Sequence, residues 1–310
     1  MTNNLPKILV LMGGPDAERA VSLMSGSEIA QALRDTARFE VIEQIIDKPT
    51  ADELRPLGGD VVFPALHGHW GEGGPLQQIL EQLGLPYIGS EPKAAALAMD
   101  KLATKRLLSA EGVQCPADCR LETDDPCALD PPLVLKPIDD GSSVDLYICR
   151  NNDEVADARA KLHPKRGAIM AERYIAGREI TVGIVCDQPL PLIEIIPGAG
   201  VEFYDYQAKY VRDDTRYILD PKLPAGVAQQ CTDVAMLAFD RLGCRDVARV
   251  DFIVNDEGPW FLEINTMPGF TTHSLVPMAA ATIGLDMPKL CAKLADAALA
   301  RAPIPTAPPS

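Results

Sequence analysis

Charged residues near the C-terminal end of the chain have the type and spacing of a metal site. The segment VARVDFIVNDEGPWFLEIN (247–265) alternates apolar and polar residues on both sides of a polar turn. This pattern predicts a β-hairpin with strands 247–254 and 259–265. Successive side chains of a strand point to opposite faces, so Arg249 and Asp251 share the polar face of the first strand.

Two carboxylates face each other in this hairpin. A turn centred on Glu257 places Asp251 directly opposite Glu263, with Asn265 on the same face. Opposed like charges destabilise a strand pair, and a divalent cation with oxygen ligands removes that cost. The hairpin therefore predicts a magnesium site, although alternation alone also fits a polar face that meets water. The following turn, MPGFTTHS (267–274), has the small and hydroxyl residues that suit a backbone close to a ligand.

Strand and helix patterns precede the hairpin. Up to about residue 98, apolar runs alternate with helical patterns, which predicts a parallel sheet. Its strands are expected at 7–12, 39–46 and 61–65. Shorter strands and two helices then predict a small α+β domain. Strands at 179–185 and 190–196 precede a loop of about 25 residues, 198–223, whose length is typical of lids and binding elements. A helix at about 226–242, the hairpin and a C-terminal helix follow.

Composition and charge restrict the class of protein. The chain has 310 residues, of which 47% are hydrophobic, so a sizeable core is available. The net charge of −15 argues against binding to nucleic acid or to an anionic membrane. Four histidines and eight scattered cysteines without a C-x-x-C pair make a zinc site improbable and predict reduced thiols. No signal-peptide pattern is evident, and we expect a cytoplasmic protein.

Several motifs resemble one family of ligases. LEINTMPGFTTHSLVP and GGPDAERAVSLMSG resemble the C-terminal and N-terminal signatures of D-alanine–D-alanine ligases. Between them lie ALHGHWGEGG, LPYIGS followed by AMDK, VLKP followed by GSSV, and FYDYQAKY, in the order and near the spacing of that family. The resemblance covers residues 7–300. A single GG or GSS would be weak, but the ordered set is specific.

This resemblance implies a three-domain ATP-grasp fold, in which an N-terminal parallel α/β domain is followed by two α+β domains that clasp ATP. The boundaries expected on this basis are 1–98, 99–178 and 179–303, with a tail at 304–310. The implied reaction phosphorylates the carboxylate of one D-alanine with ATP, and the amine of a second D-alanine attacks the acyl phosphate. It also implies two Mg²⁺ ions, with Mn²⁺ able to substitute, a homodimer, and a place in peptidoglycan precursor synthesis.

The resemblance assigns the residues of the ATP site. The magnesium ligands are Asp251, Glu263 and Asn265. The residues that contact ATP are Lys101, Lys136, Glu172, Arg173, Ile175, Glu179, Phe203, Lys209 and Leu262. In this set the lysines bind phosphates, Glu179 binds the ribose, and Phe203 and Leu262 enclose the adenine. From the residues alone, Lys101 and Lys136 could equally be surface lysines, and Leu262 a core residue.

The resemblance also assigns the amino-acid site. Its catalytic residues are Glu18, Ser142, Tyr210, Arg249 and Gly269. The residues that bind substrate are Glu18, His67, Tyr210, Arg249, Gly269, Ser274 and Leu275. Arg249 and the backbone N–H of Gly269 would stabilise the oxyanion, and Tyr210 favours an amine over a hydroxyl nucleophile. Without the resemblance, Glu18 would be an early-helix carboxylate favoured by the helix dipole.

The sequence departs from the family pattern at a few positions. Asp145 stands where glycine is usual in the phosphate-covering loop, which also contains Asp139 and Asp140. Three carboxylates close to a triphosphate are unfavourable, so we expect this loop to close less readily. Ala20 and Gly74 replace acidic residues on the side of the first substrate, and the segment between Val113 and Leu133 is short.

Two alternatives remain open at this stage. The first is a related ligase with D-lactate or D-serine as acceptor, which would share every ATP and magnesium residue. The second is a nucleotide-binding paralogue with impaired catalysis, which only the acidic loop favours. Product analysis separates the first from D-alanine ligation, and phosphate release that depends on D-alanine excludes the second.

Overall fold

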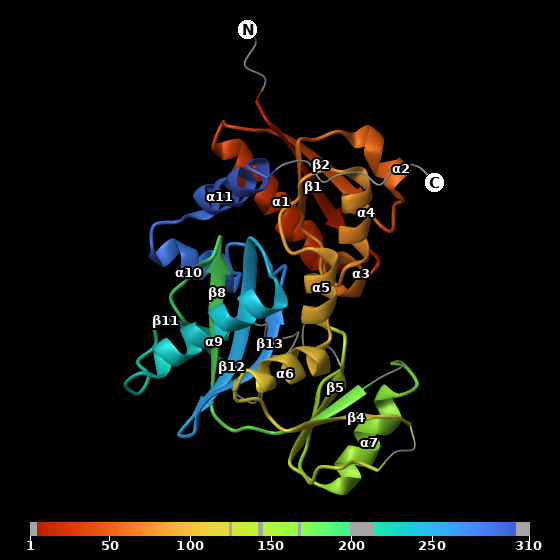
Figure 1. Ribbon diagram of the computed structural model, residues 1–310, viewed down its shortest axis with the longest axis vertical. Coiled ribbons are helices and arrows are strands. Elements are labelled where there is room, and N and C mark those ends of the chain that lie inside the picture. Colours follow the sequence, from red (N-terminus) through yellow and green to blue (C-terminus); the bar gives the residue numbers. More distant parts are fainter. Residues whose placement is uncertain (1–4, 124–125, 142–144, 167–168, 199–213, 302–310) are drawn as a thin grey trace.

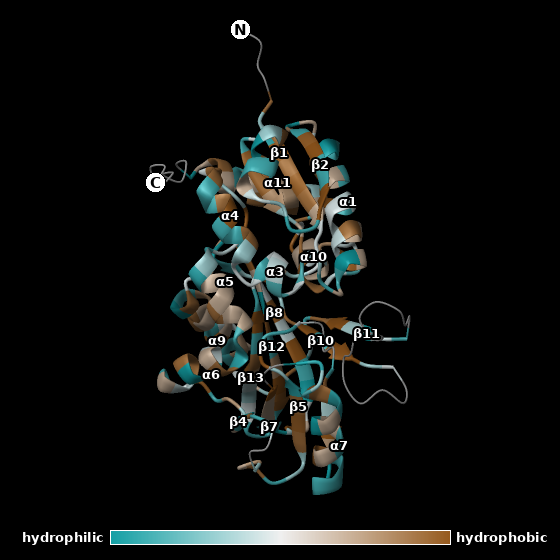
Figure 2. Ribbon diagram, turned by 90° about the vertical axis from the view of Figure 1, so that its right-hand side faces the viewer, coloured by the Kyte–Doolittle hydropathy of each residue, from teal (hydrophilic) through white to brown (hydrophobic). Residues whose placement is uncertain are grey.

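The computed structural model describes residues 5–123, 126–141, 145–166, 169–198 and 214–301. Three sheets follow one another along the long axis of the molecule, with the N-terminal sheet at the top of Figure 1 and the central domain at the bottom. Figure 2 shows apolar stretches in the strands of each layer and helices that carry both hydrophilic and hydrophobic residues. This arrangement confirms the predicted mixture of parallel α/β and antiparallel α+β parts.

The N-terminal sheet is parallel, with the strand order β2–β1–β3. Its strands are β1 (Lys7–Gly13), β2 (Glu40–Ile46) and β3 (Val61–Pro64). Ile8 and Val10 pack into one hydrophobic core, and Leu9 and Leu11 pack into another on the opposite face. The run is continuously apolar because β1 is buried on both faces. The helices are α1 (Arg19–Asp35), α2 (Ala51–Leu54), η1 (Arg55–Leu57), α3 (Gly68–Glu72), α4 (Pro75–Leu83) and α5 (Pro92–Met99).

The central domain has an antiparallel sheet with the order β4–β7–β5–β6. It is reached through α6 (Lys101–Ala110), and helix α7 packs against the sheet. Its elements are β4 (Asp118–Leu121), β5 (Leu133–Pro137), β6 (Tyr147–Cys149), α7 (Asn152–Leu162) and β7 (Ile169–Arg173). Strand β4 lies in the polar, proline-containing stretch 114–132, where no strand was predicted. Its four residues include a single buried apolar side chain, Leu121, so alternation gave no signal.

The largest sheet has the order β11–β10–β8–β12–β13, with β9 paired to β8. Its elements are β8 (Arg178–Val185), β9 (Gln188–Pro189), β10 (Ile193–Ile196), β11 (Arg216–Leu219), α9 (Val227–Leu242), β12 (Val247–Asn255) and β13 (Gly258–Asn265). The expected loop 198–223 is wrong in part, because 216–219 form the edge strand β11. The strand expected at 190–196 begins at Ile193.

A β-bulge sets the register of the hairpin. The turn is one residue tighter than expected, since Asn255 pairs with Gly258 and Phe252 pairs with Phe261. The register shifts between Asp251 and Phe252, so that Asp251 still lies opposite Glu263. The predicted pairing of Asp251 with Glu263 is therefore confirmed. It results from the bulge and not from the turn that we expected.

The last two helices return to the N-terminal core. They are α10 (Leu275–Thr282) and α11 (Met287–Leu299), and α11 lies beside α1 in Figure 1. Leu290 and Leu294 of α11 share a core with Ile29 and Leu33 of α1. Among the described helices none alone has the length and hydropathy of a membrane span; α10 and α11 meet that test only as a pair bent by 102°.

Candidate active site

Two pockets adjoin where the three sheets meet. The upper pocket lies between the N-terminal domain and the β12–β13 hairpin, and the lower pocket lies between the central sheet and the same hairpin. Their empty volumes are about 930 and 910 Å³, open solvent included. Four residues line both pockets: Lys101, Asp140, Gly141 and Glu263. A group bound at this junction would be within reach of ligands in either pocket.

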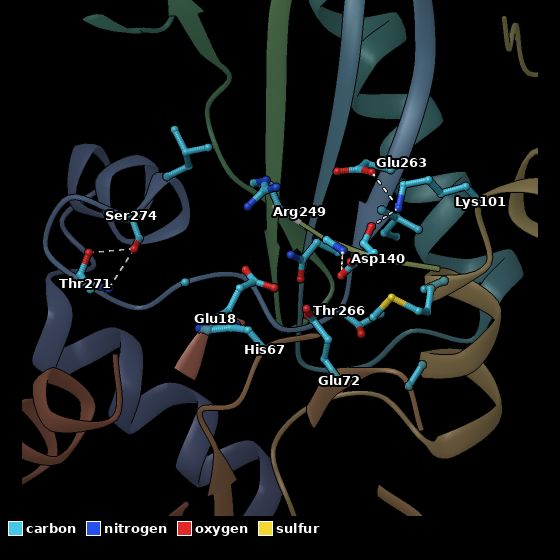
Figure 3. Close-up of a pocket in the computed structure, with 18 of the residues that line it drawn as sticks. Glu18, His67, Glu72, Lys101, Asp140, Arg249, Glu263, Thr266, Thr271 and Ser274 are labelled. Carbon is cyan, nitrogen blue, oxygen red and sulfur yellow. Dashed lines mark hydrogen bonds and ion pairs between the residues drawn. The ribbon is translucent and has the colours of Figure 1, made fainter. Parts of the chain in front are cut away.

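The upper pocket gathers charged groups from distant parts of the sequence. Figure 3 shows Glu18, His67 and Glu72 together, with Arg249 and Glu263 also pointing into the pocket. Glu18 is the residue that precedes α1, and its carboxylate is 6% exposed. The opposed charges of these groups suit a zwitterion such as an amino acid.

His67 is held in place by two contacts. Its Nδ1 lies 3.0 Å from the carbonyl oxygen of Met267, and its Nε2 lies 3.5 Å from Ser25 Oγ. Because a carbonyl only accepts, Nδ1 carries a proton. Burial lowers the pKa of His67, and it outweighs the opposite effect of the Glu18 carboxylate. The imidazole is therefore neutral at pH 7 and links the N-terminal domain to the turn after the hairpin.

Glu72 also lines the upper pocket, although sequence reasoning did not select it. Its Oε1 accepts a hydrogen bond of 3.0 Å from the Gly68 N–H, while Oε2 is buried without a partner among the described residues. Burial and the nearby Glu18 carboxylate raise its pKa well above the usual range. The only sequence signal was its place in the HGHWGEGG motif.

The turn after the hairpin contributes a backbone surface to the upper pocket. A Cβ on Gly269 would lie 2.9 Å from Ser274 Oγ, so a larger residue there would displace the Ser274 hydroxyl. Ser274 Oγ accepts a hydrogen bond of 2.9 Å from the Thr271 N–H and does not cap α10. The N-terminal amides of α10, which starts at Leu275, therefore remain available for an anion such as a carboxylate.

The predicted metal ligands lie together on the hairpin. Asp251 is 7% exposed and accepts hydrogen bonds of 2.6 Å from Thr181 Oγ1 and of 2.8 Å from Arg249 Nη2. Glu263 Oε2 lies 3.4 Å from Lys101 Nζ. Asn265 Oδ1 accepts a hydrogen bond of 2.8 Å from the Met267 N–H. All three present oxygen atoms at the pockets or beside them.

These residues fit magnesium bound together with a phosphate. Within the described residues, no three acidic, histidine or cysteine side chains are gathered closely enough to hold a metal. The hairpin supplies two opposed carboxylates, and magnesium often takes one or two carboxylates and completes its shell with water and substrate phosphates. Arg249 and Lys101 balance the charges of Asp251 and Glu263 in this structure.

The lower pocket contains a buried charge network. Glu172 Oε1 accepts a hydrogen bond of 2.6 Å from Lys136 Nζ, and Oε2 accepts one from Lys105 Nζ. Burial would raise the pKa of Glu172, but Lys105 and Lys136 outweigh it and hold the pKa at about 2. Burial would lower the pKa of Lys136, but Glu172 and Glu263 outweigh it and raise the pKa. Lys136 therefore presents a permanent positive charge to the pocket.

The other residues of the lower pocket match most of the expected nucleotide set. Lining it are Arg173, Tyr174, Ile175, Glu179 and Leu262. Strict alternation along the strand predicts that Leu262 and Glu263 point to opposite faces. This prediction is wrong, because at the bulge both side chains line the lower pocket. Ser142, Phe203, Lys209 and Tyr210 lie outside the described residues.

Sequence reasoning missed two further residues that hold the site together. Lys105 is 1% exposed and lies one helical turn after Lys101 in α6. The spacing of four residues, which places both lysines on one face of the helix, could have indicated it. Thr181 faces Asp251 across the β8–β12 pair, and nothing in its local sequence distinguishes it. Both act through a neighbour rather than on a ligand.

Comparisons with known proteins agree with this geometry. The family model described as "D-ala D-ala ligase C-terminus" matches residues 116–296. The D-alanine–D-alanine ligase of Syntrophotalea carbinolica is 40% identical over 93% of this chain and 94% of its own length. The crystal structure of the Bacillus anthracis enzyme complexed with ATP is 33% identical, has a TM-score of 0.84, and is matched over 96% of this chain and 98% of that one. The VanG D-Ala:D-Ser ligase of Enterococcus faecalis is 26% identical, with a TM-score of 0.80 over 94% of this chain and 99% of that one.

The three sheets and the two adjoining pockets define an ATP-grasp ligase. Within that class, the chain belongs to the D-alanine–D-alanine ligase family.

Proposed function

We propose that this protein joins two D-alanine molecules into D-alanyl-D-alanine at the expense of ATP. The observation that carries the proposal is the junction at which Lys101 and Glu263 line both pockets. A nucleotide in the lower pocket and an amino acid in the upper pocket would meet there. Family membership supports the identity of the amino acid. The product is a precursor for peptidoglycan, so the reaction serves cell-wall synthesis.

ATP occupies the lower pocket in this proposal. Lys101 and Lys136 bind its phosphates, and the segment from Glu172 to Ile175 holds the adenine. Glu179 binds the ribose, and Leu262 packs on the base. The apolar side chains that line the pocket include Val134, Ile148 and Ile253, which suits an aromatic ring. Phe203 and Lys209 keep their expected roles as predictions.

Magnesium is held by Asp251, Glu263 and Asn265 in this proposal, together with the phosphates. When bound, it neutralises the charge of the triphosphate and of the transferring phosphoryl group. The protein's own contribution is the pair of opposed carboxylates that the bulge keeps in register. The number of ions and the use of Mn²⁺ remain predictions.

The two amino acids occupy the upper pocket. Glu18 accepts from the ammonium of the first D-alanine, and neutral His67 lies beside it without adding a charge that would repel that ammonium. The carboxylate of the second D-alanine binds at Ser274 and Leu275, at the start of α10. Ser142 and Tyr210 are expected to complete this arrangement.

The chemistry follows from these positions. A carboxylate oxygen of the first D-alanine attacks the γ-phosphorus of ATP, and the bond to the ADP oxygen breaks. The amine of the second D-alanine then attacks the acyl carbon, and Arg249 and the Gly269 N–H stabilise the negative oxygen of the tetrahedral intermediate. Phosphate leaves with the original carboxylate oxygen, and the amine loses its proton as the peptide bond forms.

An assay of ADP release with identified products tests this proposal. The assay is run with D-alanine, L-alanine, D-serine or D-lactate alone, and with each of the last three together with D-alanine. Mass spectrometry identifies the products. We expect ADP release with D-alanine alone and D-alanyl-D-alanine as the main product. A preference for D-serine or D-lactate as acceptor would favour the alternative acceptors, for which the VanG likeness is the supporting observation. ADP release that ignores every amino acid would contradict ligation.

Two expectations about the whole protein also remain proposals. A reaction that consumes ATP fits a cytoplasmic enzyme, and the family resemblance favours a homodimer. Sedimentation of the purified protein at micromolar concentration tests the second: twice the chain mass of 33.4 kDa is expected, and a monomer would contradict it.

A further inference from the structure

One arginine links the two ends of the acidic phosphate-covering loop. Arg166 follows α7, and its Nη1 lies 2.7 Å from Asp140 Oδ2. Its Nη2 lies 3.0 Å from Asp145 Oδ2, and its Nε donates a hydrogen bond of 3.1 Å to the same oxygen. Lys165 adds a weaker contact, with Nζ 3.3 Å from Asp145 Oδ1. The sequence had suggested that these carboxylates were uncompensated, and the structure pairs two of the three.

Asp145 itself adopts an unusual backbone conformation. Its φ is +58°, in the left-handed region that favours glycine, and its side chain is 15% exposed. A side chain has a steric cost in this region. Aspartate is among the residues that tolerate this conformation best, and the bonds from Arg166 offset the cost. The unusual conformation of Asp145 thus coincides with a charged partner, Arg166, in the same chain.

Asp140 connects this cluster to the ATP site. Its carbonyl oxygen accepts a hydrogen bond of 2.5 Å from Lys101 Nζ, and its Oδ1 accepts one of 2.9 Å from the Gly141 N–H. Asp140 and Gly141 line both pockets. Burial raises the pKa of Asp140, and Arg166 acts in the opposite direction. An arginine presents its donors in a fixed planar fork, which suits two carboxylates at once better than the single flexible ammonium of a lysine.

We propose that Arg166 is a positioning residue for ATP: it neutralises Asp140 and Asp145 beside the phosphate site and, through Asp140, fixes the carbonyl that Lys101 contacts. This inference rests on the proposed use of ATP in the lower pocket. Without Arg166, the Asp140 carboxylate would lie beside the triphosphate without its guanidinium partner, and the carbonyl that Lys101 contacts would be less well fixed. The effect is therefore expected on ATP and not on D-alanine.

Variants at neighbouring positions test the role of Arg166. Arg166→Met should raise the KM for ATP and the Kd for ATP with magnesium about tenfold, the equivalent of about 1.4 kcal/mol, and leave the KM for D-alanine within about twofold. Lys165→Met removes the same charge from the adjacent residue and should change both KM values less than about twofold. Arg166→Lys, which keeps the charge and loses the fork, should lie between wild type and Arg166→Met.

A rescue separates electrostatics from misfolding. Replacing Asp140 and Asp145 by Asn in the Arg166→Met background removes the uncovered charges and should recover most of the ATP affinity. An ATP Kd of Arg166→Met within about twofold of wild type would overturn the proposal, as would an equal loss with Lys165→Met or no recovery in the triple variant. The Kd for ATP is measured without D-alanine, so it does not depend on dipeptide formation. A wild-type protein that binds ATP but forms no dipeptide would refute the proposed function, and the role of Arg166 in ATP binding could still be tested.

Discussion

At the scale of single residues, Glu263 carries the most specific prediction. It pairs with Asp251 across the hairpin and contacts Lys101, and it lines both pockets. Glu263→Gln keeps the size of the side chain and removes the charge that would bind magnesium. We expect kcat to fall about a hundredfold and the magnesium concentration for half activity to rise. An ADP-release assay over a magnesium titration measures both.

The matched control lies in the same hairpin. Glu257 is exposed in the turn between the strands and contacts neither pocket. Glu257→Gln should leave kcat and the magnesium dependence at their wild-type values. Normal activity of Glu263→Gln would show that this carboxylate does not bind the metal. The pairing of Glu263 with Asp251 would then not matter for catalysis.

The buried lysine network predicts how stability depends on pH. Ionised Glu172 has a pKa of about 2, below the ordinary 4.5, so its stabilising contribution is complete above pH 4.5 and is lost as the pH falls toward 2. Lys105→Met leaves Glu172 with Lys136 alone. We expect about 3 kcal/mol less unfolding free energy at pH 7, and acid unfolding that begins at a higher pH. Urea titrations between pH 3 and 7 measure both effects.

An exposed lysine serves as the control for that variant. Lys289 pairs with Asp286 on the surface, with 64% of its side chain exposed. Lys289→Met should leave the stability and its pH profile near wild type, because solvent screens such pairs. If Lys105→Met were as stable as this control at every pH, the network would not be the source of the depressed Glu172 pKa.

At the scale of elements, the bulge in β13 decides which side chain reaches the lower pocket, where we propose that ATP binds. Phe261 is fully buried in the core behind the sheet, while the next residue, Leu262, lines the lower pocket. Leu262→Ala should raise the KM for ATP about tenfold through lost apolar contact, with little change in stability. Phe261→Leu should leave the KM for ATP near wild type and lower the unfolding free energy by about 1 to 2 kcal/mol.

Kinetics and denaturant unfolding of the two variants separate these outcomes. If Phe261→Leu raised the KM for ATP and Leu262→Ala did not, the register beyond the bulge would differ from the one described. The two residues are adjacent and both apolar, so composition cannot explain a difference between them.

The hairpin also indicates what a sequence can predict at this scale. Alternation predicted the two strands, the polar face of β12 and the apolar face that includes Val250 and Phe252. It could not predict the bulge, because an extra residue leaves no mark in a pattern that is already irregular at Phe261-Leu262. Strands β4 and β11 were missed because each has four residues and depends on its partner strand.

At the scale of the whole molecule, the C-terminal helix stabilises the N-terminal domain. Leu290 of α11 is fully buried in the core that α1 and β1 share. Leu290→Ala should cost about 3 kcal/mol of unfolding free energy. Hydrogen exchange should show faster exchange in α1 as well as in α11. Lys293→Ala, on the exposed side of the same helix, should change neither; loss of protection confined to α11 would contradict a shared core.

Contacts of this range set the limit of the sequence reasoning. Motifs predicted many of the residues that line the pockets, because a family resemblance assigns positions in the sequence without using any geometry. The sequence did not indicate that Arg166 would meet Asp145, that Lys105 would meet Glu172, or that α11 would pack on α1. Each of these contacts joins elements that are distant in the chain but close in space. Local periodicity carries no information about such contacts.

In the proposed reaction, ATP and an amino-acid carboxylate meet where the two pockets join. D-alanine labelled with ¹⁸O in its carboxylate shows whether they do, because the released phosphate takes one oxygen from the first substrate. Mass spectrometry of the phosphate after one turnover should find one ¹⁸O atom for each dipeptide formed. Unlabelled phosphate would mean that water or another group attacks ATP, and that the carboxylate is never phosphorylated at this junction.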